Sequence, residues 1–311
     1  MSSETSPFFY KSAGADVGFD PLQPASLNDP LRLKIKNATN LLSFETVDWG
    51  QVAIKWQASL YPAHIRQRLS VVHEGIDTSR AIPGNPTLTL PGTDLELTKK
   101  DAIITYVARN LEPYRGFHVF MACLPELLDR HPHAHVVIVG ADGVSYGPAS
   151  ATGASYKDIL LNQFGPALDL KRVHFLGVVP YQILISIFQI SAAHIYLTYP
   201  FVLSWSVMEA MSAGCVVIGS STPPVKEIIQ DGHNGLLVDF FDTKAICDQV
   251  TRVLNCPNRM QAVKENARRS IIDKYDFRSK MKPRFMKMID ALVRHEDPNY
   301  LLSLLEDGLA S

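Results

Sequence analysis

The sequence predicts an α/β protein whose larger part is a doubly wound parallel sheet, and two observations lead to this fold class. Between about residues 100 and 275, short apolar runs of buried-strand length alternate with segments that have the spacing of amphipathic helices. Residues 194–217 contain one complete unit in the order strand, turn, helix and strand. Units of this type, repeated along a chain, build parallel sheets with helices on both faces.

The unit at residues 194–217 has clear start and stop signals. Its first strand ends at Pro200, in a Thr-Tyr-Pro turn. Either Ser204 or Ser206 can cap the start of the helix, and Gly214 closes the helix before a second apolar run. The helix has an apolar face made by three residues at helical spacing, Val207, Met208 and Met211.

One carboxylate, Glu209, lies within this helix, near the place where an open parallel sheet holds its ligand. Unpaired amides and the positive end of the helix dipole make the helix start a favourable anion site. The alternative is that Glu209 is a solvated helix residue. Its neighbours, Val-Met before and Ala-Met after, favour a partly buried face and therefore a site.

Composition places the chain among ordinary globular proteins. It has 311 residues, 46% hydrophobic content and a formal charge of −1, which suits two modest domains and gives no nucleic-acid footprint. The four cysteines lack metal-binding spacing, and we interpret them mainly as buried free thiols in a reducing cytoplasm. The N-terminal residues contain no signal-peptide core, and no apolar run has the length of a membrane helix.

The first hundred residues are less regular than the rest. Residues 1–30 contain several Pro and Gly residues and are predicted to be loop. The expected elements that follow are a helix at 31–42, a strand at 46–54, a short helix or turn within 55–68, and a strand at 69–72. Residues 83–99 have the Pro, Gly and Thr content of a linker, with room for a small hairpin.

After the linker the pattern becomes regular. Strands are expected at residues 102–107, 135–139, 173–176, 194–197, 215–218 and 236–238. Helices are expected at 114–130, 157–164, 181–189, after Ser204, from 222 to 229, and at 243–254, 259–275 and 278–294. Residues 140–156 form a loop rich in Gly and Ser.

Two arginines, Arg109 and Arg115, follow the first strand of this regular region. The carboxyl end of a parallel strand faces the ligand crevice, and guanidinium groups there suit a diphosphate or another dianion. The alternative is a pair of surface salt bridges with Glu112 and Glu126. The start of the later helix, near Leu203, would supply a second contact to the same anion.

Several segments together resemble the retaining glycosyltransferase family four, the group 1 glycosyltransferases of GT-B fold. The segment VARNLEPYRGFHVF resembles that family's strand followed by a "GR…KG" motif. SVMEAMSAGCVVIGSSTPPVKEIIQDGHNGLLVDFFD resembles its long "LEAMACG-PVI…PE-I-DG–GLLV" signature. DWGQVAIKWQASLYP with SVVHEGID resembles the end of its N-terminal domain, so the likeness runs from about residue 48 to 275.

The resemblance implies a domain order. A partial N-terminal, acceptor-side α/β domain and linker would occupy residues 1–98. A Rossmann-like domain that binds the nucleotide sugar would occupy 99–275. The helices of 276–311 would cross back to the N-terminal part, as they often do in this fold.

The resemblance also implies the chemistry. A sugar would pass, with retention, from a nucleoside-diphosphate sugar to the hydroxyl of a glycan or other acceptor in polysaccharide or glycoconjugate synthesis. No metal or other cofactor is implied, and the cytoplasmic protein could touch a membrane only peripherally. Arg109 and Arg115 would hold the diphosphate and act catalytically, and Glu209 would accept the ribose hydroxyls. The remaining donor contacts would come from the amides of Leu203, Ser204 and Trp205, and from the residues after Gly177, which would lie against the base.

The chain departs from the family pattern at several positions. Phe201 replaces the first of two glutamates eight residues apart, so the sugar-facing carboxylate is missing and Glu209 alone remains. Phe201 is either a stacking platform for a sugar or a core residue, and we expect core. Val202-Leu203-Ser204 replaces a Gly-Phe-Gly, and Arg115 stands where Lys is usual, which keeps the charge.

The N-terminal region leaves two hypotheses open. Fewer than 100 residues precede the linker, enough for only the last strands of an acceptor domain. The chain is therefore either a truncated or reduced glycosyltransferase, or a non-catalytic nucleotide-sugar-binding remnant or partner subunit. Epimerase chemistry on the same fold lacks a dedicated acid/base pair. Alternating His131, His133 and His135 have no Cys or carboxylate nearby and are interpreted as loop residues.

Overall fold

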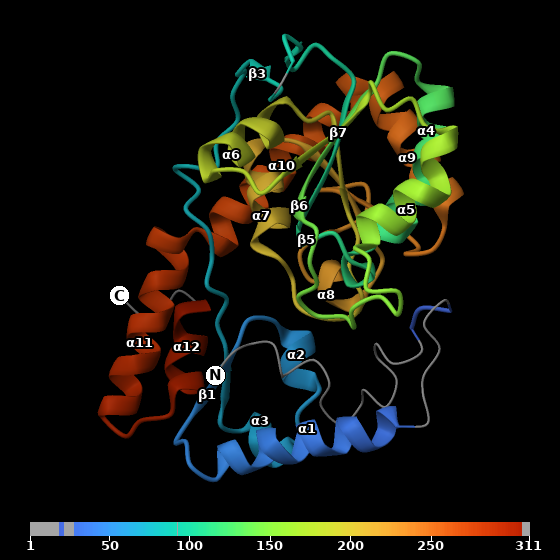
Figure 1. The fold of residues 1–311 in the computed structure, drawn as a ribbon. Helices are drawn as coiled ribbons and strands as arrows, with labels where there is room; N and C mark the ends of the chain where they lie inside the picture. Colours follow the sequence, from blue (N-terminus) through green and yellow to red (C-terminus); the bar gives the residue numbers. More distant parts are fainter. Residues whose placement is uncertain (1–18, 22–27, 92, 307–311) are drawn as a thin grey trace. The chain divides into compact units, whose positions relative to one another are not determined.

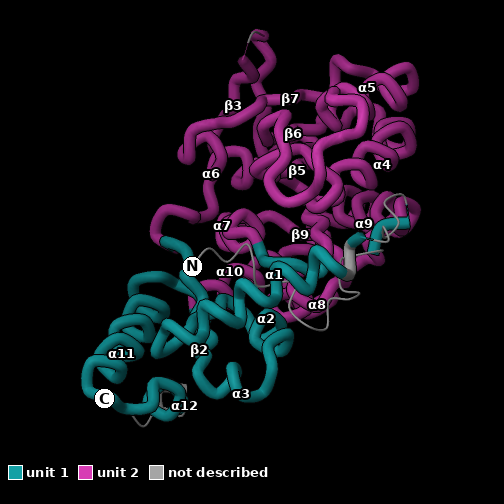
Figure 2. The backbone as a smooth tube through the Cα atoms, turned by 60° about the horizontal axis from the view of Figure 1, so that its bottom comes forward, with its two compact units in different colours: residues 1–77, 200–203, 273–311 teal, residues 78–199, 204–272 magenta. Residues whose placement is uncertain are grey.

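The computed structural model describes residues 19–21, 28–91 and 93–306. Most of the predicted loop at 1–30 lies outside these residues. The described chain forms two compact units, shown in Figure 2. Unit 1 falls within residues 1–77, 200–203 and 273–311, and unit 2 comprises 78–199 and 204–272. The sequence-based division was placed at 98/99 and 275/276, whereas the compact units divide at 77/78 and 272/273.

Unit 2 is built on a six-stranded parallel sheet, which confirms the predicted fold class. The strands lie in the order β10-β9-β8-β5-β6-β7. Their bounds are β5 Ile103–Asn110, β6 His135–Ala141, β7 Val173–Gly177, β8 Ala193–Tyr196, β9 Val216–Ser220 and β10 Leu236–Val238. Within this sheet, β5 is the first strand along the chain and lies in the middle. The next two strands, β6 and β7, are added on one side of β5. The chain then returns to form β8 on the other side of β5, followed outward by β9 and β10. This is the doubly wound 3-2-1-4-5-6 order.

Helices cover both faces of this sheet (Figure 1). On one face α4 (Phe117–Arg130) packs against α5 (Tyr156–Phe164) and α9 (Thr243–Asn255). On the other face α6 (Tyr181–Ile190) packs against α7 (Trp205–Ala213). Right-handed crossovers between parallel strands require this two-sided arrangement. The strands are consequently buried on both sides, as their continuous apolar runs predict.

Helix α4 shows how sequence pattern and backbone conformation set an element's start. The buried face of this helix is formed by apolar residues at helical spacing: Phe117, Phe120, Met121, Leu124, Leu127 and Leu128. The helix starts at Phe117 and not at the predicted position 114, because Pro113–Arg115 form a separate 3-10 turn. Gly116 joins the two with φ of +72°, and a Cβ there would lie 2.3 Å from Leu197 Cβ. Only glycine fits this position.

The predicted linker is folded as part of unit 2. The strands β3 (Leu88–Thr89) and β4 (Glu96–Leu97) pair antiparallel, which confirms a small hairpin within residues 83–99. Unit 2 also contains α8 (Pro223–Lys226) and most of α10 (Gln261–Tyr275), whose last three residues fall in unit 1. The α8 helix ends three residues before the predicted Ile229.

Unit 1 contains a two-stranded parallel sheet of β1 (Gly50–Val52) and β2 (Leu69–Val71). Helices α1 (Asp29–Phe44), α2 (Lys55–Ser59) and α3 (Ala63–Arg66) also belong to this unit. Its main core is formed by Phe44, Val52, Leu60, Tyr61, Ile65 and Leu69. The strand predicted at 46–54 is thus shorter, and the segment 55–68 folds as two short helices.

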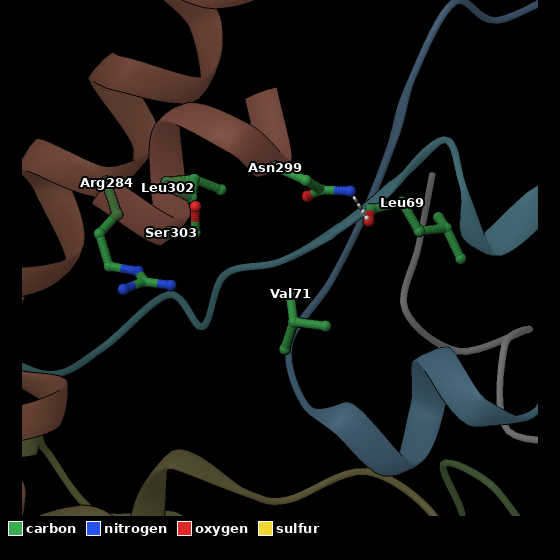
Figure 3. A pocket seen from close by; sticks show the side chains of 6 residues that line it. All are labelled: Leu69, Val71, Arg284, Asn299, Leu302 and Ser303. Carbon is green, nitrogen blue, oxygen red and sulfur yellow. Dashed lines mark hydrogen bonds between the residues drawn. The ribbon is translucent and has the colours of Figure 1, made fainter. Parts of the chain in front are cut away.

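The C-terminal helices belong to this same unit. A π-helical turn, Phe277–Met281, leads into α11 (Lys282–Val293), and α12 is Pro298–Glu306. Asn299 of α12 donates from Nδ2 to the Leu69 carbonyl at 2.9 Å, and its Oδ1 accepts from Ser70 Oγ at 2.8 Å. Between β2 and these helices lies a cavity of about 260 Å³ (Figure 3), lined by Leu69, Val71, Arg284, Asn299, Leu302 and Ser303.

The cysteines fit the sequence interpretation. All four are free; Cys123, Cys215 and Cys247 are buried, and Cys256 is half-buried. Within the part of the chain that the structure describes, no helix has both the length and the apolar character needed to cross a bilayer.

Candidate functional site

The topology of unit 2 defines where a ligand belongs. The strand order reverses between β5 and β8, which lie side by side in the middle of the sheet. The connections after these two strands lead to opposite faces, and an open sheet of this topology is expected to bind its ligand beyond their carboxyl ends. Residues 111–116 follow β5, and residues 197–204 follow β8. The side chains of these segments, together with the loop after β6, therefore decide what the crevice binds.

Arg115 links the two strand ends. It comes from the 3-10 turn after β5 and is buried. Its Nη1 donates to Thr198 Oγ1 at 2.8 Å and to Tyr196 Oη at 3.4 Å. Tyr196 is the last residue of β8, and Thr198 follows two residues later. A guanidinium is therefore held at the switch point of the sheet.

The loop after β6 closes over this arginine. The Glu112 carboxylate is fully buried and accepts backbone hydrogen bonds from Ser145, Tyr146 and Gly147 at 3.0–3.2 Å. In this conformation the Tyr146 ring covers the Arg115 guanidinium, with 5.0 Å between the guanidinium carbon and the ring centroid. A carboxylate that accepts hydrogen bonds from several backbone amides holds a loop strongly in one conformation. Glu112 thus orders the loop that contacts Arg115.

Tyr196 connects Arg115 to the start of α7. The backbone N–H of Ser204 donates to Tyr196 Oη at 2.8 Å. The Tyr196 hydroxyl therefore accepts hydrogen bonds from both Arg115 and the Ser204 amide. Ser204 caps α7 by accepting from Ser206 N at 3.3 Å, which settles the two predicted cap positions. Burial raises the pKa of Tyr196, and Arg115 opposes that rise. Trp205, the first residue of α7, is exposed.

Glu209 lies in a different set of contacts. It is 8% exposed, so it is not the solvated residue of the alternative interpretation. Burial raises the pKa of Glu209, while a hydrogen bond from Tyr181 and the charge of Arg80 act in the opposite direction. The guanidinium carbon of Arg80 lies 4.3 Å from the centroid of the Tyr181 ring. The structure thus places Glu209 with Tyr181 and Arg80, and Arg115 with Tyr196 and Thr198.

The other predicted residues occupy simpler positions. Arg109 is exposed near the end of β5. Gly177 ends β7 with φ of +62°, and the space around a Cβ there is open. Leu203 is buried. Phe201 is also buried, as expected of a core residue.

Sequence reasoning missed four residues of these networks. Tyr196, Thr198, Tyr181 and Arg80 carry no motif, and only the fold brings them to Arg115 and Glu209. The sequence suggests Glu112 only as a partner for the arginines, and Tyr146 lies in the predicted loop at 140–156. Glu126, the other suggested partner, forms an ion pair with Arg130.

The histidines at the start of β6 do not form a metal cluster. His135 Nδ1 and His174 Nε2 lie 3.0 Å apart, with their rings stacked. Among the residues that the structure describes, no group of three or more His, Cys, Asp or Glu side chains is arranged to hold a metal ion.

The order of the six strands, with helices on both faces, defines a doubly wound α/β domain. A family model described as "Glycosyl transferases group 1" matches residues 93–270, and one described as "Glycosyl transferase family 4 group" matches 6–81. The chain therefore belongs to the group 1 glycosyl transferase family, as the resemblance of its motifs indicates.

Curated relatives match over part of their length. D-inositol 3-phosphate glycosyltransferase of Corynebacterium efficiens is 28% identical over 189 residues, which is 60% of this chain and 43% of that protein. Spore coat protein SA of Bacillus subtilis is 23% identical over 218 residues, or 66% of this chain and 54% of that protein. The chain thus spans less than half the length of the first of these relatives.

Solved structures show the same GT-B architecture. Sucrose-phosphate synthase of Thermosynechococcus elongatus has a TM-score of 0.68 at 16% identity, covering 91% of this chain and 67% of that one. HepE of Anabaena, crystallised with UDP, has a TM-score of 0.66 at 14% identity, covering 89% and 71%. These similarities support the fold, including the predicted GT-B class.

Proposed function

We propose that this chain binds a nucleoside-diphosphate sugar at the carboxyl edge of the unit 2 sheet and transfers the sugar to a hydroxyl acceptor with retention. The observation that carries the proposal is Arg115, a buried guanidinium between the ends of β5 and β8. Family membership supplies the reaction class. The acceptor is a glycan or another hydroxyl compound.

The diphosphate lies against the switch point in this proposal. Arg115 and Arg109 meet its charge, and the start of α7 adds its dipole. HepE of Anabaena was crystallised with UDP and with UDP-glucose, which makes uridine the first base to test. The residues after Gly177, where open space adjoins the end of β7, lie against the base.

Glu209 binds the ribose in this proposal. A carboxylate accepts hydrogen bonds from both vicinal hydroxyls of a ribose, as acidic residues do in dinucleotide-binding folds. Tyr181, which hydrogen-bonds to Glu209, keeps the carboxylate oriented. Ionised Glu209 is the form that accepts both hydroxyls, so donor binding requires its deprotonation.

The chemical step is electrostatic. As the glycosidic bond to the donor breaks, negative charge grows on the leaving diphosphate, and the two arginines stabilise it. The acceptor hydroxyl forms the new bond on the same face of the sugar, and its proton passes to the departing phosphate oxygen. We propose that no divalent cation takes part, because the arginines and the helix start provide the positive charge.

Release of nucleoside diphosphate from UDP-, GDP- and ADP-glucose tests this function. We expect one donor to yield free diphosphate, with and without excess EDTA, and Arg115→Ala to abolish the signal. Binding of a donor without release or transfer to any sugar acceptor would instead favour the non-catalytic binding subunit. Release that requires added Mg²⁺ would contradict the metal-free mechanism.

A further inference from the structure

Helix α1 of unit 1 has two apolar faces, and only one of them is covered. On the covered face, Leu33 and Phe44 are buried beside the polar Asn40, and Phe44 packs edge-on against Tyr61 within the unit 1 core. The opposite face is formed by Leu31, Ile35, Ala38 and Leu42, which fall within about 60° of one another around a helix of 3.6 residues per turn. We call these four residues the outer stripe.

The outer stripe is open to solvent. Leu31, Ile35 and Leu42 are 61%, 60% and 68% exposed, and Ala38 is also exposed. Isolated exposed apolar residues are ordinary, but an aligned row of them on one helix is typical of an interaction surface. An amphipathic pattern needs one apolar face for the protein core, and α1 has a second.

Positive charge flanks the outer stripe. Arg32, Lys34 and Lys36 are exposed, and positions 31–44 include no acidic residue. Lys34 projects on one side of the stripe and Arg32 on the other, about 70° and about 90° from the stripe centre at 100° per residue. Lys36 lies further round the helix, about 130° from the stripe centre and towards the buried face. The surface is therefore an apolar row with one cation along each side, both in the first half of the helix.

We propose that this face of α1 docks on an anionic lipid surface, with the outer stripe among the acyl chains and the flanking cations, Arg32 and Lys34, at the headgroups. A helix that lies in the interface plane has this distribution, with apolar residues on one side and Lys and Arg at its margins. Long cationic side chains reach the headgroups while their stems stay in apolar contact. The proposal does not depend on the glycosyltransferase reaction.

Charge decides against a second copy of the chain as the occupant. In a parallel pair of α1 helices, the two flanking cations of each copy would face those of the other. In an antiparallel pair they would face positions 38–44, which carry no charge. Neither arrangement gives these cations a carboxylate from positions 31–44 of the partner helix, whereas anionic headgroups complement both.

Vesicle sedimentation with the full chain tests the proposal. The probes are vesicles of phosphatidylcholine alone and vesicles that also contain phosphatidylglycerol. The test variant is Lys34→Glu with Ile35→Gln, which reverses the charge of one flanking cation and replaces one stripe residue by a polar one. The matched control is Leu170→Gln with Lys171→Glu in unit 2, where Leu170 is 54% exposed and its neighbour is also an exposed cation. Circular dichroism establishes that each chain is folded.

We expect binding to the anionic vesicles only, weakening as salt is raised. The α1 variant should lose at least about tenfold in partitioning, given about 1 kcal/mol per cation near the surface, while the control stays within about twofold of the parent. Failure of the folded parent to bind, equal binding to neutral vesicles, or an unaffected α1 variant would overturn the proposal. So would sedimentation of the free chain as a dimer that the α1 variant dissociates, since the stripe would then bind a second copy.

Discussion

Arg115 Nη1 lies 2.8 Å from Thr198 Oγ1, and this hydrogen bond joins the turn after β5 to the segment after β8. The two strands meet at the switch point of the sheet, so the contact fixes a guanidinium at the place where a doubly wound fold binds its ligand. Tyr196 and Tyr146 complete the surroundings of the arginine. The proposed donor site depends on this arrangement.

Replacement of Arg115 distinguishes charge from geometry. Arg115→Lys keeps the charge but loses the planar fork that contacts Thr198 and Tyr196. We expect donor affinity to fall by about 10- to 100-fold in Arg115→Ala, because a hydrogen bond to a charged group contributes about 1.5–3 kcal/mol, and by less in Arg115→Lys. Equilibrium titration with UDP-glucose measures the donor affinity of each variant. Equal loss in the two variants would mean that fork geometry, and not charge, matters here.

Glu112 should stabilise unit 2 through the loop that it orders. In Glu112→Gln, an amide group with only one acceptor oxygen faces three backbone donors. We expect a loss of about 1–3 kcal/mol in the free energy of unfolding by urea. Glu126→Gln serves as the control, because its exposed pair with Arg130 should contribute less than about 1 kcal/mol. A Glu112 variant as stable as this control would show that the loop is ordered without it.

Most of the fold could be predicted because unit 2 repeats one pattern of apolar strand and amphipathic helix. The βαβ unit at 194–217, with its Gly214 stop and Ser204 cap, follows local rules that the structure obeys. The start of α4 was missed because the close approach of Leu197 to Gly116 is a long-range contact. In unit 1, predicted strands proved shorter because only a two-stranded sheet supports them.

The candidate site was predictable only where a motif marks it. Arg109, Arg115 and Glu209 stand at motif positions next to strand or helix ends. Tyr196 does not stand at a motif position. It accepts hydrogen bonds from Arg115 and from the Ser204 amide, which are 81 and 8 residues away in sequence. Such partners follow from the order of strands in the sheet, which the linear pattern does not specify.

Donor binding should weaken as the pH falls. Burial raises the pKa of Glu209, so its carboxylate takes up a proton at a higher pH than a solvated glutamate does. Protonation removes acceptor capacity for the ribose hydroxyls. UDP-glucose is the suitable probe, because its diphosphate has no secondary ionisation in this range. We expect the affinity of the parent to decline below neutral pH, and Glu209→Gln to bind more weakly but with a flatter pH profile. Parallel profiles would place the titrating group elsewhere.

His194 should make unit 2 sensitive to acid. Burial lowers the pKa of His194 from 6.5 to about 3, with its Nδ1 2.9 Å from Thr105 Oγ1. Because the folded-state pKa is depressed, the neutral ring contributes stability above the unfolded value of 6.5, and this stability is lost as the pH falls towards 3. The uptake of one proton changes the free energy of unfolding by at most about 1.4 kcal/mol per pH unit.

Urea unfolding between neutral pH and pH 4 measures this effect. His194→Asn is expected to be less stable throughout but to lose less stability on acidification than the parent. His133→Asn, at an exposed position, serves as the control variant. An unaltered slope in the His194 variant would assign the acid sensitivity to other groups.

The most direct test of the central claim is calorimetric titration of the chain with UDP, GDP and ADP, alongside Arg115→Ala and Glu209→Ala. The account predicts that one nucleotide binds and that each variant weakens this binding by about 10- to 100-fold, which corresponds to about 1.5–3 kcal/mol. A folded chain that binds none of the three nucleotides, or that binds one equally well without Arg115 and Glu209, would contradict the assignment of the donor site to the carboxyl edge of this sheet.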